Sequence, residues 1–398
     1  MWRPPFAADP LPAGARIVEE LDVAIVGAGP VGAALAAFLA PLGWRVRVIE
    51  ARTAPSRDKR TLALSQASRE LLEDAGAWPA TGVTPISEIH ISQQGGPGRT
   101  LLRAREQGLP ALGYTVAYAA LEQELQARLA VLRVPVSFGA PCEAIALAPD
   151  AATLQLSSGE SVTAGLLVLA DGGVNARRIP GLAYEEKDYG QVAVTGSVHV
   201  DRPHAGRAWE RFTPSGPIAL LPVDDRYALV WTAAPAEGER LEALDESGFL
   251  RELQRHFGDR AGRFVRAGSR ARFALKLRTI NTPIAQRTAI VGNAAQAMHP
   301  IAGQGLNLGL RDAAALAGVL MALPVAEAGS RQALEHFRAS RRRDAGRGVA
   351  FTDFLVRAFA DERRMPTLGR GLALAVLDLV PAARRILAER MIRGAHSP

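Results

Sequence analysis

The sequence predicts an α/β protein in which a domain with a parallel sheet is interrupted by an antiparallel-sheet domain and followed by C-terminal helices. Three observations predict it. A short apolar strand at 21–26 leads into a glycine-rich turn, strand-like runs between Pro, Gly and Asp fill 191–232, and a short apolar run returns at 288–291. Short, fully apolar strands are typical of buried parallel sheets, and runs between turn residues are typical of antiparallel ones.

The first elements are a strand, a turn, a helix and a second strand. Residues 21–26 are apolar except for Asp22, and "GAGPVG" comes next. The following apolar residues recur on one helical face: Val31, Leu35, Leu39 and Leu42. Gly43 is placed to end that helix, and "RVRVIE" alternates like a strand that ends at Glu50. This order predicts a βαβ unit and a Rossmann-like domain.

The glycine-rich turn has the spacing of a dinucleotide-binding motif. Gly27 would permit a tight turn, Gly29 would let the backbone approach a diphosphate, and Gly32 would let the helix pack closely on the strand. The anion would bind the free N–H groups at the positive end of the helix. Glu50, about 20 residues further on, would accept hydrogen bonds from ribose hydroxyls. The alternative is a turn that binds nothing, but the flanking strand and helix favour a dinucleotide.

The middle of the chain leads to a second motif. The patterns predict, in order, helices at Ser65–Ala75 and Tyr118–Leu132, a hairpin that turns at Ser158-Gly159, and a buried strand at Leu166–Ala170. Asp171-Gly172 follows this strand, and Arg177 and Arg178 come soon after. An Asp-Gly pair is most often only a turn. The arginines would either meet a diphosphate or hold the turn.

The third motif is "GNAAQAMHPIAGQGLNLGLRD", which spans residues 292–312. Asn293 follows a short apolar strand, at the edge where ligands of open α/β sheets bind. Gly303, Gly305 and Gly309 flank a helix whose apolar face continues to Leu320. Glycines before a helix leave its first N–H groups uncovered, which favours an anion or a polarised carbonyl. The alternative is an ordinary capped turn.

Composition restricts the other classes of function. A chain of 398 residues should form two domains, or one domain with a large insertion. Cys142 is the single cysteine, so no internal disulfide forms, and we predict no metal site. We find no signal peptide and no apolar run long enough to span a membrane, so we expect a cytoplasmic protein.

The basic charge is concentrated at the C-terminal end. Residues 331–398 contain 14 Arg, no Lys and 7 acidic residues, so the whole net charge of +7 arises there. Three interpretations stay open: helices that pack on the parallel-sheet domain with solvated arginines, a surface for an anionic membrane or a lipid-presenting complex, or nucleic-acid binding. We predict no nucleic acid, because no aromatic residues alternate with the arginines.

These motifs resemble those of flavoprotein aromatic hydroxylases with the para-hydroxybenzoate hydroxylase fold, and most closely their ubiquinone-biosynthesis branch. The resemblance covers roughly residues 20–395. "GAGPVG" is similar to the first FAD fingerprint and Asp171-Gly172 to the middle motif. "GNAAQAMHPIAGQGLNLGLRD", "RAWERFTPSGPIALLP" and "LVWTAAP" are similar to the branch's own patterns. Asn175 and Tyr118 depart from the residues usual at their positions, which affects single contacts only.

The resemblance implies bound FAD, with NAD(P)H and O2 as co-substrates. It implies these cofactor contacts: Gly27, Gly29, Pro30 and Gly32 at the diphosphate, Glu50 at the ADP ribose, Arg60 near the flavin side, Asp171 and Gly172 in the middle motif, Asn293 at the ribityl chain, and Gly303, Gln304, Gly305, Leu306 and Asn307 along the isoalloxazine ring. His299 and Pro300 would lie beside the ring and are the candidate catalytic residues. No base that activates a phenol can be named from the sequence.

The resemblance also predicts domain limits and a reaction. Residues 20–85, 113–182 and 283–325 would form the FAD-binding domain, 86–112 and 183–282 the substrate domain, and 326–398 a basic helical region. The reaction would hydroxylate a polyprenylated phenol of ubiquinone biosynthesis through a flavin C4a-hydroperoxide. Peripheral membrane contact or a biosynthetic complex would suit such a substrate. An FAD-dependent reductase or dehydrogenase, and a non-catalytic flavin-binding subunit, are the alternatives.

Overall fold

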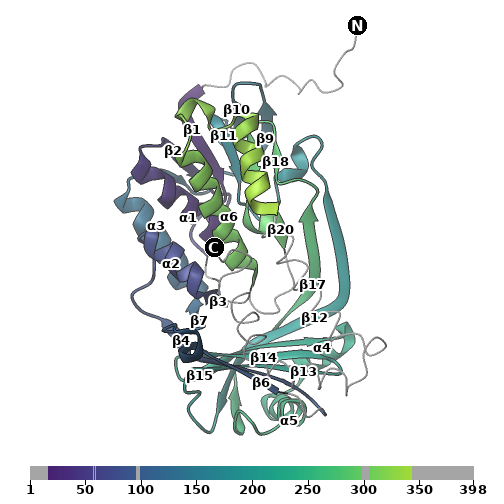
Figure 1. Cartoon of the computed structure of the whole chain (residues 1–398). Coiled ribbons are helices and arrows are strands. Elements are labelled where there is room, and N and C mark those ends of the chain that lie inside the picture. The colour runs from purple at the N-terminus through teal and green to yellow at the C-terminus, as the bar shows by residue number, and fades with distance from the viewer. Residues whose placement is uncertain (1–16, 57, 59, 96–98, 298–303, 343–398) are drawn as a thin grey trace.

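The computed structural model describes residues 17–56, 58, 60–95, 99–297 and 304–342. Figure 1 shows a parallel-sheet unit covered by helices, and below it a second sheet with two helices on its far side. The α/β fold class is therefore confirmed, and a strongly bent pair of long strands joins the two units. The candidate residues His299, Pro300 and Gly303, and the arginine-rich segment after 342, lie outside the described residues.

The first sheet has the strand order β18-β19-β11-β1-β2-β8, and neighbours from β19 to β8 run parallel. β9 and β10 extend it through antiparallel pairs. Its strands are β1 (Ile17–Val26), β2 (Val46–Ile49), β8 (Val136–Ser137), β9 (Cys142–Leu147), β10 (Ala152–Leu156), β11 (Ser161–Leu169), β18 (Ile284–Ala285) and β19 (Thr288–Ile290). The predicted strands at 21–26, 166–170 and 288–291 are thus neighbours, although most of the chain separates the last from the first. Their carboxyl ends share one edge.

Four helices cover one face of this sheet: α1 (Pro30–Leu39), α2 (Gln66–Asp74), α3 (Tyr118–Val131) and α6 (Gln304–Met321). α1 is in the middle and packs against both α3 and α6. It can approach closely because its buried face is mostly glycine and alanine, with Leu35 and Leu39 fully buried. The helix then tightens into η1 (Ala40–Leu42) and ends at Gly43 with φ of 83°, as the sequence predicted. α2 begins at a capping Ser65, also as predicted.

The second sheet has the order β20-β17-β12-β15-β14-β13-β5-β6, with β16 paired to β12. Its pairs are antiparallel except β5 with β13, which run parallel. The strands are β5 (Glu88–Gln93), β6 (Arg99–Arg103), β12 (Tyr184–Val200), β13 (Arg207–Thr213), β14 (Gly216–Val223), β15 (Arg226–Ala233), β16 (Phe264–Ala267), β17 (Ala271–Ile280) and β20 (Gln296–Ala297). A small sheet of β3 (Thr61–Ser65), β7 (Gly113–Ala117) and β4 (Val83–Ile86) lies between the two units.

Two helices cover one face of the second sheet. They are α4 (Pro235–Ala243) and α5 (Glu246–Phe257), with Asp245 as the N-cap of α5. Between the helices and the sheet lies a core rich in aromatic residues, in which Trp231, Tyr227 and Phe249 are almost fully buried. These helices keep the aromatic face dry, so the opposite face of β13–β15 is left to form part of the cavity described below. The predicted domain limits stay a prediction.

The short elements that remain are η2 (Ala104–Gln107), η3 (Ala176–Arg178), η4 (Gly292–Ala294), η6 (Val325–Glu327) and a helix at 331–342. The last helix is attached to α6 through Arg341, whose guanidinium binds the buried carboxylate of Asp312. Within the described residues, no helix is long and apolar enough to cross a membrane. Because Arg341 binds Asp312 on α6, the basic region packs on the parallel-sheet unit up to residue 342.

Candidate active site

A cavity of about 720 Å³ joins the carboxyl edge of the first sheet to the open face of the second. It brings together residues that the sequence predicted from separate motifs: Gly27, Gly29, Pro30, Glu50, Arg60, Asp171, Gly172, Asn293, Gly305, Leu306 and Asn307. Gly32 lies behind this wall, under the turn. Much of the remaining lining comes from β3, β5, β13, β14 and β15. One end of the cavity is polar backbone and the other is mostly apolar side chain.

The three glycines of the turn are glycine for different reasons. Gly27 has φ of +110°, and a Cβ there would lie 2.6 Å from the Ala170 carbonyl oxygen. A Cβ on Gly32 would lie 2.1 Å from the Gly27 carbonyl oxygen, so the protein's own backbone requires glycine at both positions. Gly29 has ordinary extended angles, and a Cβ there would meet only the Tyr118 hydroxyl, at 3.8 Å. Nothing in the described chain requires glycine at position 29, and its empty side faces the cavity.

The N-terminus of α1 is open to that same space. Gly29 is its N-cap, no side chain caps the helix, and Pro30 stands in its first turn. The N–H groups of a first helical turn have no partner within the helix. Together with the helix dipole, they form a site that suits a phosphate group.

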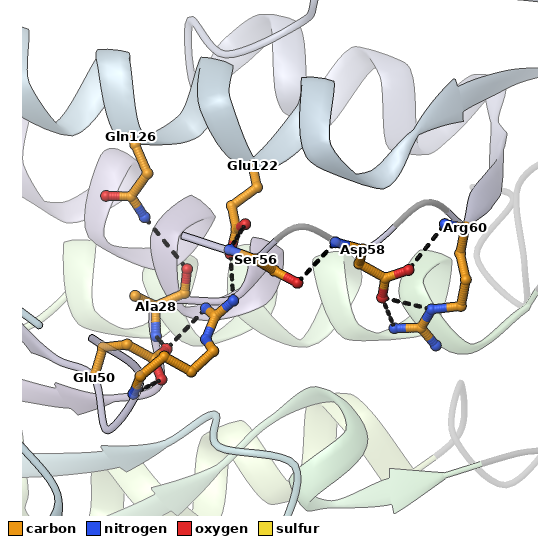
Figure 2. A network of polar contacts seen from close by, with 8 residues as sticks. Ala28, Glu50, Ser56, Asp58, Arg60, Glu122 and Gln126 are labelled. Atoms are coloured by element: carbon orange, nitrogen blue, oxygen red, sulfur yellow. Dashed lines mark hydrogen bonds and ion pairs between the residues drawn. The ribbon is translucent and has the colours of Figure 1, made fainter. Parts of the chain in front are cut away.

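Glu50 lies at the end of β2 and holds the turn from the other side (Figure 2). Its carboxylate accepts hydrogen bonds from the Ala28 N–H at 2.8 Å and from the Arg52 N–H and guanidinium, each at 2.9 Å. Burial alone would raise the pKa of this carboxyl, but the bonds from Arg52 and Ala28 hold the pKa below its ordinary value. The carboxylate stays ionised, and because three of its roughly four acceptor positions are taken, about one remains for a ribose hydroxyl.

The sequence did not predict the second carboxylate of this network. Glu122 on α3 is 1% exposed, accepts the Ser56 N–H at 2.6 Å and pairs with Arg52 at 2.9 Å. One helical turn further along, Gln126 donates to the Ala28 carbonyl oxygen at 3.3 Å. Figure 2 shows these side chains pointing from α3 toward the turn. The sequence carries no local signal for this contact, because Ser56 and Glu122 are 66 residues apart.

Arg60 has a local partner. Its guanidinium pairs with Asp58 and lies over the Tyr118 ring, 5.6 Å from the ring centroid. Hydrogen bonds to Asp58 raise the pKa of this arginine more than burial lowers it, so the guanidinium stays protonated. Tyr118 thus packs against Arg60, and both residues line the cavity.

Asp171 mainly holds its own turn. Its carboxylate accepts the Gly173 N–H at 2.9 Å and both the N–H and the side-chain amide of Asn175 at 2.8 Å. Asn175 is therefore a donor to Asp171. The two arginines that follow do not line the cavity: Arg177 pairs with Glu186, and Arg178 donates to the Glu143 carbonyl oxygen. Of the two alternatives for these arginines, the structure favours a role in holding the turn.

The third motif supplies the opposite wall. Asn293 follows β19 with its side chain exposed to the cavity, and a Cβ on Gly305 would lie 3.7 Å from its Oδ1. Gln304 is the first residue of α6, and Leu306 lines the cavity. Asn307 binds β3 and α2 instead: its amide oxygen accepts the Ser65 N–H and the Ser68 hydroxyl, and its nitrogen donates to Ala63. The side chain of Asn307 is therefore largely occupied by the protein.

The open face of the second sheet forms the last wall. Because side chains alternate along a strand, the residues that face the cavity are Ile89 on β5, Ala208 and Glu210 on β13, Ala219 and Leu221 on β14, and Val230 on β15. Their registers place them side by side. All but Glu210 are apolar. A flat, apolar ring packs on such a surface, and water does not compete for it.

Comparison with known proteins agrees with these features. A family model described as an FAD binding domain matches residues 20–352. The ubiquinone hydroxylase UbiL of Rhodospirillum rubrum is 36% identical over 96% of this chain and 91% of its own length. The 3-demethoxyubiquinol 3-hydroxylase of Escherichia coli is 36% identical over 75% of this chain and 79% of its own.

A more distant relative and a solved structure extend the comparison. The human mitochondrial ubiquinone biosynthesis monooxygenase COQ6 is 27% identical over 94% of this chain and 93% of its own. The crystal structure of p-nitrophenol 4-monooxygenase PnpA from Pseudomonas putida superposes with a TM-score of 0.78 at 19% identity. It covers 96% of this chain and 100% of that one, and shows that the fold is shared. The chain therefore belongs to the FAD binding domain family, in its branch of ubiquinone-biosynthesis aromatic hydroxylases with the para-hydroxybenzoate hydroxylase fold.

Proposed function

We propose that this protein is an FAD-dependent monooxygenase that hydroxylates the aromatic ring of a polyprenylated phenol in ubiquinone biosynthesis. NAD(P)H would be the electron donor and O2 the oxidant. The observation that carries the proposal is the single cavity, which joins a dinucleotide-binding edge to an apolar wall. The names of the relatives support the substrate class. In the overall reaction, the ring C–H, O2, NAD(P)H and one proton give the hydroxylated ring, NAD(P)+ and water.

The residues present fit FAD. The space beside Gly29 and the open N-terminus of α1 would hold the diphosphate, and Glu50 would bind the ribose. Asn293, Gly305 and Leu306 would border the flavin ring, because all three line the cavity. When bound, FAD would take a hydride from NAD(P)H and activate O2 for transfer of one oxygen atom to the substrate.

The protein itself would position the substrate ring and exclude water from it. The wall of Ile89, Ala219 and Leu221 would hold the phenol ring flat and keep water from the reacting atoms. The N-terminal end of α6 would place partial positive charge near the ring edge that becomes anionic on reduction. His299 and Pro300 stay candidate catalytic residues from the sequence alone.

The direct test is turnover by the purified protein loaded with FAD. We expect a yellow protein whose NAD(P)H oxidation is stimulated by a prenylated phenol, with one ¹⁸O atom from ¹⁸O2 in the product by mass spectrometry. The methyl ether of the same phenol is the matched control for the hydroxyl group. A protein that takes up no FAD would contradict the proposal. Anaerobic reduction of the substrate without an oxygen-dependent product would instead identify a reductase.

We also propose peripheral contact with anionic membranes, because a polyprenylated phenol is a lipid and the whole net charge of +7 arises in residues 331–398. We expect the full chain to co-sediment with phosphatidylglycerol vesicles at low salt, to be released by high salt, and not to bind phosphatidylcholine vesicles. The same chain ending at residue 342 is the matched control, because the described structure extends that far. Equal sedimentation of both chains, or none of either, would contradict the proposal.

A further inference from the structure

Glu210 stands where the strand pattern calls for an apolar residue. Its side chain shares a strand face with Ala208 and Phe212, both of which are buried. Its cross-strand neighbours are Ala219 on β14 and Ile91 on β5. A carboxyl group on this wall costs free energy unless it has a partner or a function.

No partner for it is found among the described residues. Glu88, on the neighbouring strand, shows the usual solution: two arginines, Arg103 and Arg207, bind its carboxylate. The Glu210 carboxylate has no such ion pair and no hydrogen bond within the described chain. The cation next to it in sequence, Arg211, faces the opposite side of the sheet and contacts Ser92 and the His256 carbonyl oxygen. Desolvation by burial raises the pKa of Glu210 to about 7.

The groups around Glu210 do not supply a charge. The elements packed beside it present these side chains to the cavity: Ile89 from β5, Ala219 and Leu221 from β14, and Val230 from β15. Leu62, Leu64, Leu112 and Ala297 line other parts of it. The remaining titratable groups of the cavity are Glu50, Arg52, Arg60, Tyr118, Cys142 and Asp171, and none of them shifts the pKa of Glu210. Among the described lining residues, Glu210 is the acid that the protein leaves without a partner.

We propose that the Glu210 carboxylate accepts the proton of the substrate's phenolic hydroxyl during ring hydroxylation. This inference rests on the proposed function. The phenolic O–H bond breaks, an O–H bond forms on Glu210, and the electron pair left on the phenolic oxygen enriches the ring toward the incoming oxygen atom. After oxygen transfer, the ring carbon loses its hydrogen as a proton to solvent, Glu210 returns its proton to the former phenolic oxygen, and the ring becomes aromatic again.

The role of Glu210 as proton acceptor determines how the rate of hydroxylation depends on pH. Only the ionised carboxylate accepts a proton, so hydroxylation falls as pH drops below the pKa of Glu210 and reaches a plateau above it. With a pKa of about 7, the acid limb lies within the physiological range. An acid with an ordinary pKa would be ionised throughout this range and would produce no such limb.

The test compares three variants of the FAD-loaded enzyme. In Glu210→Gln, hydroxylation should fall on the order of 100-fold and lose its acid limb, while FAD retention and NAD(P)H oxidation continue and release hydrogen peroxide. Glu210→Asp should recover part of the rate and the limb, because a base is restored. Glu239→Gln, an exposed glutamate on α4 in the same sheet unit, is the matched control and should behave as wild type.

Infrared spectroscopy gives a readout that does not require turnover. Wild type should show a protonated-carboxyl C=O band that disappears as pH rises through about 7, and Glu210→Gln should lack it. The proposal is overturned if Glu210→Gln hydroxylates within about twofold of wild type with an unchanged pH profile, or if it loses FAD or fold. If wild type itself hydroxylates no phenol, the proposed function fails, whereas the infrared band still reports on the state of Glu210.

Discussion

Gly29→Val should abolish FAD retention and leave the protein folded. Position 29 has ordinary backbone angles and room for a side chain in the protein, so the substitution introduces no internal clash. The added methyl groups would stand between the backbone and a bound diphosphate, and would cover the N–H groups at the start of α1. We expect FAD affinity to fall by at least about 100-fold, which is about 3 kcal/mol. Flavin fluorescence after gel filtration, with circular dichroism for the fold, measures both quantities.

Two other glycines make this prediction specific. Gly32→Val should destabilise the whole unit, because its Cβ would lie 2.1 Å from the Gly27 carbonyl oxygen. Gly318→Val, at an exposed position of α6 with no atom within 4 Å of the added Cβ, should retain both fold and flavin. If Gly29→Val retained FAD as well as Gly318→Val does, the diphosphate would bind elsewhere.

Asp312→Ala should give the largest loss of stability among substitutions away from the cavity. Asp312 is 3% exposed, and its carboxylate accepts the Gly292 N–H at 2.9 Å and binds the buried Arg341 guanidinium. Breaking one side of a buried ion pair costs about 3–5 kcal/mol. Urea denaturation monitored by tryptophan fluorescence should show this loss. FAD affinity should weaken too, because Gly292 precedes Asn293 at the wall of the cavity.

The comparison for this prediction lies on the same helix as Arg341. Glu335 pairs with Arg338 at the surface, so Glu335→Ala should change the free energy of unfolding by less than about 1 kcal/mol. Asp312→Asn keeps an acceptor for the Gly292 N–H and should fall between the two. A urea midpoint for Asp312→Ala equal to that of Glu335→Ala would show that the Asp312–Arg341 pair does not attach the helix at 331–342 to α6.

The sequence was informative wherever a local rule controls structure. The βαβ unit followed from apolar spacing, the end of η1 from Gly43, and the start of α2 from Ser65. The parallel strand at 288–290 was recognisable because it is short and carries no charged residue. In each case the signal lies within a few residues of the feature, and the same physical constraint acts in any fold.

The features that were missed depend on contacts between distant segments. In the sequence Glu122 is one acidic residue of a helix among others, and only the fold brings Arg52 and Ser56 into contact with it. Glu210 was within a motif quoted for its resemblance, but alternation along a strand does not reveal what covers each face. Asn307 depends on distant contacts too: it lines the cavity, three bonds to β3 and α2 hold its side chain, and its predicted ring contact stays a prediction.

The long strands β12 and β17 have a consequence for how the cavity can open. β12 has 17 residues, a length of about 55 Å when extended, and it pairs with β17 from Tyr184 to Thr195. At one end Tyr184 donates to the Ala294 carbonyl oxygen beside Asn293, and at the other β12 pairs with β15 in the sheet that carries Glu210. The two walls are thus ends of one stiff ribbon, with a register shift between Asp188 and Gln191. If the two walls of the cavity move relative to one another, we expect β12 and β17 to bend at that irregularity. The two units should not separate.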